Sequence, residues 1–95
     1  MRYRFSVTDP AAIEGRTRAL AAAATTANYM VSLEGFVSEA CTAELLGVAE
    51  STLRDWRNSG RYELRHRRLG GKRGRVQYCL RSLAAFLLAA EDGST

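Results

Sequence analysis

The sequence has few cysteines and histidines, the residues that cross-link small secreted domains or bind metal ions. Its 95 residues include two cysteines, one histidine and one proline. Cys41 and Cys79 lie far apart among apolar residues, which predicts reduced core thiols of a cytosolic protein, with a disulfide between them as the alternative. Because these cysteines and His66 lack the spacing of metal ligands, we expect no metal site.

Long apolar runs are also lacking. No segment approaches the roughly 20 apolar residues that a membrane-spanning helix needs, and no apolar segment follows Arg2 and Arg4 as it would in a secretory signal. There is no glycine-rich phosphate loop and no nucleophile beside a base, and we find no carboxylate pair suited to a cleft. We therefore expect a cytoplasmic protein without catalytic residues or cofactor, which is not an enzyme and does not contact a membrane.

Acidic residues are scarce in one part of the chain only. Residues 54–81 hold ten of the fourteen Lys and Arg residues, with Asp55 and Glu63 as their acidic residues, and so carry a net charge of +8. The rest of the chain has four basic and eight acidic residues and carries −4. Such a separation of charge gives the electrostatic field a direction, and the basic end should attract a polyanion. Nucleic acid is the first candidate.

The N-terminal third has its own pattern. Residues 2–7 alternate between apolar and polar side chains, which predicts a short strand. Asp9 is then a suitable N-cap, with Pro10 at the first position of a helix that ends near residue 28. This helix is rich in alanine, and Leu20 is one of its few large apolar residues. It therefore needs a close-packed partner, and we expect residues 1–35 to form an extension for packing or dimerisation.

Two short helices follow, over residues 39–46 and from residue 49 or 50 to residue 59. Ser38 is a good N-cap for the first of them. Gly47 and Gly60 each follow a helix, as glycine at the C′ position commonly does. Two short helices joined by a tight turn after a glycine form a helix-turn-helix arrangement.

A β-hairpin and a last helix complete the pattern. Residues 61–69 are extended and basic, residues 70–74 form a turn with three glycines, and residues 75–78 can return as a paired strand. The last helix is predicted by an inner stripe that consists of Leu83, Phe86, Leu87 and Ala90. The expected DNA-binding domain is therefore residues 36–90, and residues 91–95 form a frayed tail.

The run TAELLGVAESTLRDWRNSG at residues 42–60, the basic hairpin and SLAAFL at residues 82–87 resemble a known family. They are similar to the MerR-like winged helix-turn-helix of phage and plasmid excisionases and AlpA-type regulators. The resemblance covers about residues 36–88. It implies a mainly α fold with a small β-hairpin as the wing, to which this chain adds the N-terminal strand and alanine-rich helix. The implied partners are double-stranded DNA and, in addition, a second copy of the chain or an integrase.

The chain departs from this family in three places. Ala49 stands where the family usually has a serine cap, and the serine cap before the last helix is displaced, leaving Arg81 or Ser82 in its place. The segment between Gly60 and Gly70 is longer and more basic than usual. No long dimerising helix or thiol-rich loop follows the domain, so we expect no small-molecule effector.

The second helix of the pair is the predicted recognition helix. Leu53 and Trp56 share one side, which should face the core, while the opposite side should enter the major groove. Arg54 can hold guanine with two hydrogen bonds, and Asn58 can pair with adenine. The alternative is a solvated polar face. The predicted DNA contacts on this helix are Ser51, Thr52, Arg54, Asp55, Arg57 and Asn58.

The hairpin is the second predicted contact. Its cations should reach phosphates or a narrow minor groove, and the glycines at its tip should allow a close approach. On an extended strand Arg65 and Arg67 share one face and Arg68 takes the other. The alternative is a charged edge hairpin that resists aggregation. The predicted DNA contacts here are Arg61, Arg65, Arg67, Arg68, Lys72, Arg73 and Arg75.

These patterns favour a sequence-specific DNA-binding protein of bacterial or phage origin, associated with the nucleoid. It would be an excisionase-like architectural factor that bends DNA, or a transcription regulator of the same build. A phage terminase small subunit is an alternative within the same class. An alternative from another class is a protein-interaction adaptor on a winged-helix scaffold, which would use the alanine-rich helix and Leu88 as its apolar surface.

Overall fold

The first helix begins where the sequence predicts it. In the computed structural model, which describes residues 9–92, α1 spans Pro10–Thr26, and the Asp9 side chain accepts a hydrogen bond from the backbone N–H of Ala11 at 3.0 Å. Asp9 is therefore the N-cap, and Pro10 occupies a position whose N–H would have no helical partner. The strand expected over residues 2–7 lies outside the described residues.

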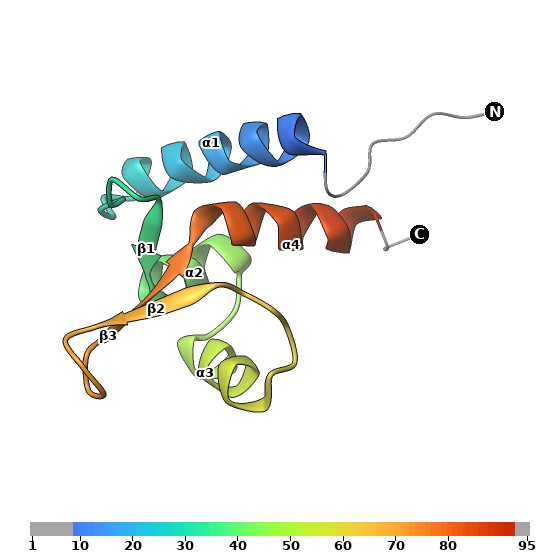
Figure 1. Ribbon diagram of the computed structural model, residues 1–95. Coiled ribbons are helices and arrows are strands. Elements are labelled where there is room, and N and C mark those ends of the chain that lie inside the picture. The colour runs from blue at the N-terminus through green and yellow to red at the C-terminus, as the bar shows by residue number, and fades with distance from the viewer. Residues whose placement is uncertain (1–8, 93–95) are drawn as a thin grey trace.

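The remaining described elements follow in the order β1 (Phe36–Ser38), α2 (Glu39–Leu46), α3 (Glu50–Ser59), β2 (His66–Leu69), β3 (Arg75–Cys79) and α4 (Leu80–Asp92). Within residues 9–92 the chain thus has four helices and one three-stranded antiparallel sheet, in the order β1-β3-β2. This confirms a mainly helical fold with a small β component. Figure 1 shows α1 and α4 side by side, with the sheet, α2 and α3 on the other side of α4.

α1 packs against α4 within the same chain. It buries Ile13, Leu20 and Ala24 in the core that also contains residues of the sheet and of α2, α3 and α4. Between Ile13 and Leu20 in the sequence, Arg16 donates two hydrogen bonds to the carboxylate of Glu91, at 2.9 and 2.8 Å. The hydrogen bonds from Arg16 lower the pKa of Glu91. The alanine-rich helix thus finds its packing partner inside the chain.

Glycines and a serine set the ends of α2 and α3 as predicted. The Ser38 hydroxyl accepts a hydrogen bond from the Cys41 N–H at 3.1 Å. Gly47 and Gly60 end the two helices with φ of 72° and 69°, a backbone conformation that costs glycine little. α3 begins at Glu50, and its N-cap residue, Ala49, makes no side-chain cap hydrogen bond.

The hairpin is present, but its first strand is shorter than predicted. β2 pairs with β3 in a register that places Arg67 opposite Gln77. Residues 61–65 form a loop instead of a strand, because Leu64 turns into the core and the Arg65 N–H is held by the Ser82 hydroxyl at 2.9 Å. β1, which the sequence analysis did not predict, pairs with the other edge of β3 and places Val37 opposite Tyr78.

The last helix departs from the prediction in two ways. It begins at Leu80, directly after β3, so neither Arg81 nor Ser82 caps it, and the Ser82 hydroxyl binds the 61–65 loop instead. Its inner stripe also differs, since Ala90 is exposed while Ala84 is fully buried. Ala84 lies two turns before Glu91, on the side that meets α1, so α4 is packed from two sides.

Trp56 is part of the packing, as predicted. Its ring lies 6.2 Å from that of Phe86 and 4.7 Å from that of Tyr62, measured between ring centroids. Tyr62 in turn lies 5.1 Å from Phe86. This aromatic cluster joins α3, the 61–65 loop and α4, and so fixes the orientation of α3 relative to the rest of the fold.

Candidate nucleic-acid interface

One side of α3 is free for contact with a ligand. Leu53 is fully buried, which turns the opposite side of the helix outward. Of the predicted contact residues, Thr52 is half-buried, whereas the others on this side are exposed, namely Ser51, Arg54, Asp55 and Asn58. Four of the six contact residues predicted on α3 are therefore exposed, as the sequence analysis predicted.

Arg57 is an exception, because it faces into the molecule. Its guanidinium Nη1 donates hydrogen bonds to the carboxylate of Glu39 and, at 2.7 Å, to the hydroxyl of Tyr78. The side chains of Arg57 and Glu39 are only 12% and 20% exposed. Burial acts to lower the pKa of Arg57, but the hydrogen bonds to Glu39 and Tyr78 raise it, so this residue is charged and holds α3 to α2 and β3. The predicted DNA contact at Arg57 is therefore corrected to a structural ion pair.

The predicted hairpin cations are mostly exposed, and Arg67 is the exception. Its guanidinium lies over the Phe36 ring, 4.1 Å from the centroid, and its Nε donates to Gln77 at 2.9 Å. Its Nη2 also reaches Glu34 at 3.4 Å. Arg67 therefore covers the outer face of the sheet and is engaged within the fold. The exposed cations are Arg61, Arg65, Arg68, Lys72, Arg73 and Arg75.

The two arginines of β2 point to opposite faces, as predicted. Arg67 pairs with Gln77 and Arg68 with Val76, so Arg68 lies on the face of Val76, which is turned toward α2 and α3. Arg65, expected to share the face of Arg67, precedes the strand. Arg68 Nη1 donates to the carbonyl of Gly74 at 3.2 Å, which holds its side chain along the turn.

A groove of about 340 Å³ lies where α3, the hairpin and the start of α2 meet. We call it the basic groove. It brings together four arginines from three places in the sequence and one carboxylate, which is the one bound by Arg57. The sequence analysis missed the contribution of α2, whose first residues were predicted only as a helix start. The residues that line the basic groove are Ser38, Glu39, Ala40, Arg54, Arg57, Arg68, Gly74, Arg75 and Val76.

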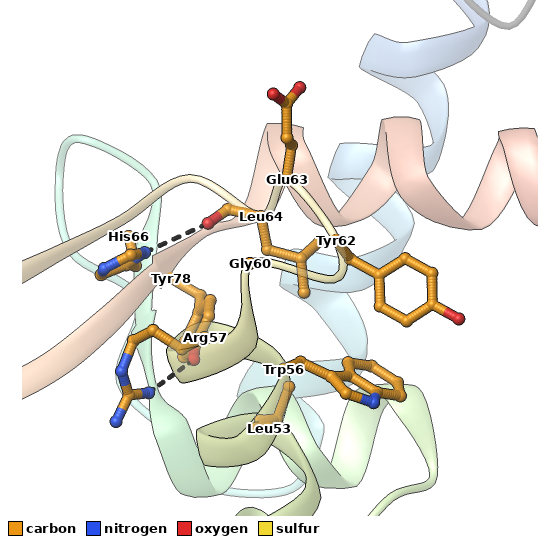
Figure 2. A pocket seen from close by; sticks show the side chains of 9 residues that line it. All are labelled: Leu53, Trp56, Arg57, Gly60, Tyr62, Glu63, Leu64, His66 and Tyr78. Carbon is orange, nitrogen blue, oxygen red and sulfur yellow. Dashed lines mark hydrogen bonds between the residues drawn. The ribbon is translucent and has the colours of Figure 1, made fainter.

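A second hollow, of about 320 Å³, lies on the other side of Arg57, between α3 and the 61–65 loop. Figure 2 shows the rings of Trp56 and Tyr62 together at one end and Arg57 with His66 at the other. His66 Nδ1 lies 3.2 Å from the carbonyl oxygen of Leu64, so the ring is tied to the loop. This arrangement joins the loop to the back of α3 and supports the orientation of its exposed side.

Burial raises the pKa of Tyr78, so its hydroxyl stays protonated near neutral pH. It can then accept the hydrogen bond from Arg57 and donate to Glu39, whose oxygen lies 3.4 Å away. Tyr78 thus completes a small polar network between the two hollows. Within this network the negative charge of Glu39 is balanced by the guanidinium of Arg57.

Among residues 9–92, no group of three or more His, Cys, Asp and Glu side chains is placed to hold a metal ion, and no helix in this range has the length and apolar character to cross a membrane. Comparisons with protein-family models, with curated proteins and with solved structures gave no match. The interpretation of the basic surface therefore rests on its geometry and charge.

Proposed function

We propose that this protein is a cytoplasmic, sequence-specific DNA-binding protein with a winged helix-turn-helix domain, and that it has no catalytic activity. α2 and α3 form the helix pair, and the β2–β3 hairpin is the wing. One observation carries the proposal. The exposed side of α3 and the face of the hairpin that holds Arg68 border the same groove, in which arginines outnumber carboxylates four to one.

The arrangement suits double-stranded DNA. An α-helix fits the major groove, and an exposed polar side such as that of α3 can reach base edges there. Arg54 and Asn58 are the side chains on α3 best suited to hold guanine and adenine. The hairpin cations would follow the adjacent backbone or enter the minor groove, where binding depends on charge and DNA shape. DNA bending of the excisionase kind or transcription regulation would both use these contacts.

Salt dependence of binding tests the proposal. Fluorescence anisotropy with a labelled duplex selected from random sequence should show an affinity that falls steeply with salt. If about six cations neutralise phosphates, the slope of log K against log salt should be about −5 to −6. A scrambled duplex should bind more weakly at the same salt concentration. A slope near zero, or equal affinity for both duplexes at all salt concentrations, would contradict sequence-specific DNA binding.

A specific observation also favours a protein-interaction role as the second candidate. Met30 and Leu33, in the connector after α1, are 86% and 104% exposed. A contiguous exposed apolar patch marks an interaction site, and these two side chains are the large apolar groups that this connector offers for one. If a stable complex with another protein formed without any DNA binding, and Leu33→Ser disrupted it, the adaptor would be the better assignment.

A further inference from the structure

The hydrogen bonds of Arg57 join the two elements that we propose to contact DNA. Its Nη1 donates to a carboxylate oxygen of Glu39, the first residue of α2, and at 2.7 Å to the hydroxyl of Tyr78 in β3. The Tyr78 hydroxyl also lies 3.4 Å from the same Glu39 oxygen. We call these three side chains the Arg57 network. Through it, α3 is tied both to the helix before it and to the central strand of the sheet.

The proposed contact residues lie next to the Arg57 network on both elements. On α3, Arg54 is exposed three positions before Arg57. On the hairpin, Arg68 pairs with Val76, which precedes Tyr78 by two positions, so Arg68 and Tyr78 lie on the same face of the sheet. A shift within the network would therefore displace the exposed side of α3 relative to this face of the hairpin.

The apolar contacts of α3 hold it to the fold without fixing its orientation in the same way. Leu53 is fully buried, and Trp56 packs in the aromatic cluster, but the burial of apolar surface is non-directional. A hydrogen bond has direction, because it weakens steeply as its angle closes. A buried ion pair is often no more stabilising than apolar side chains of similar volume. The Arg57 network thus adds direction to the packing of α3 more than stability.

We propose that Arg57 is a positioning residue that determines how well this protein discriminates between DNA sequences. Through Glu39 and Tyr78 it sets the place of the α3 side chains relative to the hairpin cations, so that both elements fit one duplex at the same time. Its own side chain is only 12% exposed, which leaves little surface for a contact with DNA. This inference rests on the proposed DNA-binding function and adds the residue that couples its two contact elements.

Removal of the Tyr78 hydroxyl tests the link to the hairpin. Tyr78→Phe leaves the ion pair between Arg57 and Glu39 in place, so the protein should stay folded. The ratio of its affinities for the selected duplex and for single-base variants of that duplex, measured by fluorescence anisotropy, should fall by roughly 3- to 10-fold. Tyr29→Phe is the matched control. It removes a hydroxyl that donates to Glu44 at 2.9 Å, outside the Arg57 network, and should keep the wild-type ratio.

This ratio of affinities separates positioning from stability. A variant that is only partly folded loses affinity for every duplex by the same factor, so its ratio stays unchanged. The loss of a phosphate contact likewise weakens binding to all sequences alike. A lower ratio therefore identifies a change in how α3 meets the bases.

Replacement of the ion pair tests Arg57 itself. The double variant Glu39→Gln/Arg57→Met removes one negative and one positive charge and leaves an amide at position 39 as a partner for the Tyr78 hydroxyl. Its ratio of affinities should also fall by roughly 3- to 10-fold. The slope of log K against log salt should stay at the wild-type value, because no phosphate contact is lost. The melting temperature should remain within about 5 °C of wild type.

The outcomes separate this inference from the function on which it rests. If either variant, shown by circular dichroism to be folded, kept the wild-type ratio, the positioning role of Arg57 would be wrong and DNA binding would stand. A salt slope smaller by about one unit in the double variant would show that Arg57 contacts a phosphate directly, which also overturns the proposal. If the wild-type protein binds no duplex at all, the DNA-binding function and the role of Arg57 in it both fail.

Discussion

The guanidinium of Arg67 lies over the ring of Phe36, with its central carbon 4.1 Å from the ring centroid. Both residues are on the outer face of the sheet, away from the basic groove. Arg67→Ala should therefore destabilise the protein by about 1 kcal/mol, through loss of the cation–π contact and of the hydrogen bond to Gln77. Arg73→Ala, which removes an exposed cation at the hairpin turn, is the matched control.

We expect Arg67→Ala to lower stability and Arg73→Ala to weaken DNA binding. Chemical denaturation should report the loss of stability in Arg67→Ala and little change in Arg73→Ala. DNA titrations should show weaker binding and a salt slope about one unit smaller in Arg73→Ala. If Arg67→Ala instead kept its stability and lost one unit of salt slope, Arg67 would be a DNA contact, as the sequence alone predicted.

Arg54 should act on specificity more than on affinity for random DNA. It is exposed on α3, where a guanidinium can hold the O6 and N7 atoms of guanine. Arg54→Ala should lose about 1–3 kcal/mol of discrimination at one base position. Binding to single-base variants of the selected duplex measures this directly. Equal losses on selected and scrambled duplexes would show that Arg54 contacts the backbone only.

Gly74 should be required for the hairpin turn. A Cβ built on Gly74 would lie 1.5 Å from the carbonyl oxygen of Leu69, so the backbone would have to move to accept any side chain. Gly74→Ala should lower stability by about 1–3 kcal/mol, as a forced backbone shift does, and should weaken DNA binding because Arg68 and Arg75 shift with the turn. Denaturant unfolding and DNA titration measure the two effects.

Gly15 is the matched control for this substitution. It lies in α1, and a Cβ there meets nothing within 4 Å. Gly15→Ala should therefore stabilise the protein by about 0.5–1 kcal/mol, since alanine loses less backbone entropy than glycine in a helix. If both glycines responded alike, the turn would not depend on the close approach of Gly74 to Leu69.

Helix boundaries were predictable from the sequence because capping is local. Asp9, Ser38 and Gly60 act on neighbours within four residues, so their roles can be read without the fold. β1 was not predictable in this way. It has three residues, which are too few for a periodic pattern. It forms a strand because it pairs with one edge of β3.

The roles of Arg57 and Arg67 were missed for a different reason. Their partners Glu39 and Phe36 lie 18 and 31 positions away in the sequence. The sequence of a basic segment therefore does not show which of its arginines are solvated and which are bound within the fold. One signal for Arg57 was available. It follows Leu53 by four residues, which places it on the buried side of α3. Arg67 carried no such signal, since its face depends on the register of β2 against β3.

We expect α1 to stabilise the fold without contacting DNA. Leu20 is 8% exposed and packs in the shared core, so Leu20→Ala should lower the free energy of unfolding by about 2–3 kcal/mol. Ala19→Ser, at an exposed position of the same helix, is the control and should change it by less than about 0.5 kcal/mol. Both proteins, where folded, should bind DNA with the wild-type salt slope.

Removal of residues 1–30 extends this test. It takes away Ile13, Leu20 and Ala24 together and uncovers the side of α4 that holds Ala84, so the melting temperature should fall further than in Leu20→Ala. The fraction that stays folded should still bind DNA with nearly the same slope, because the groove cations lie outside this segment. A truncated protein with unchanged stability and lost DNA affinity would show instead that the N-terminal segment is a DNA-contacting arm.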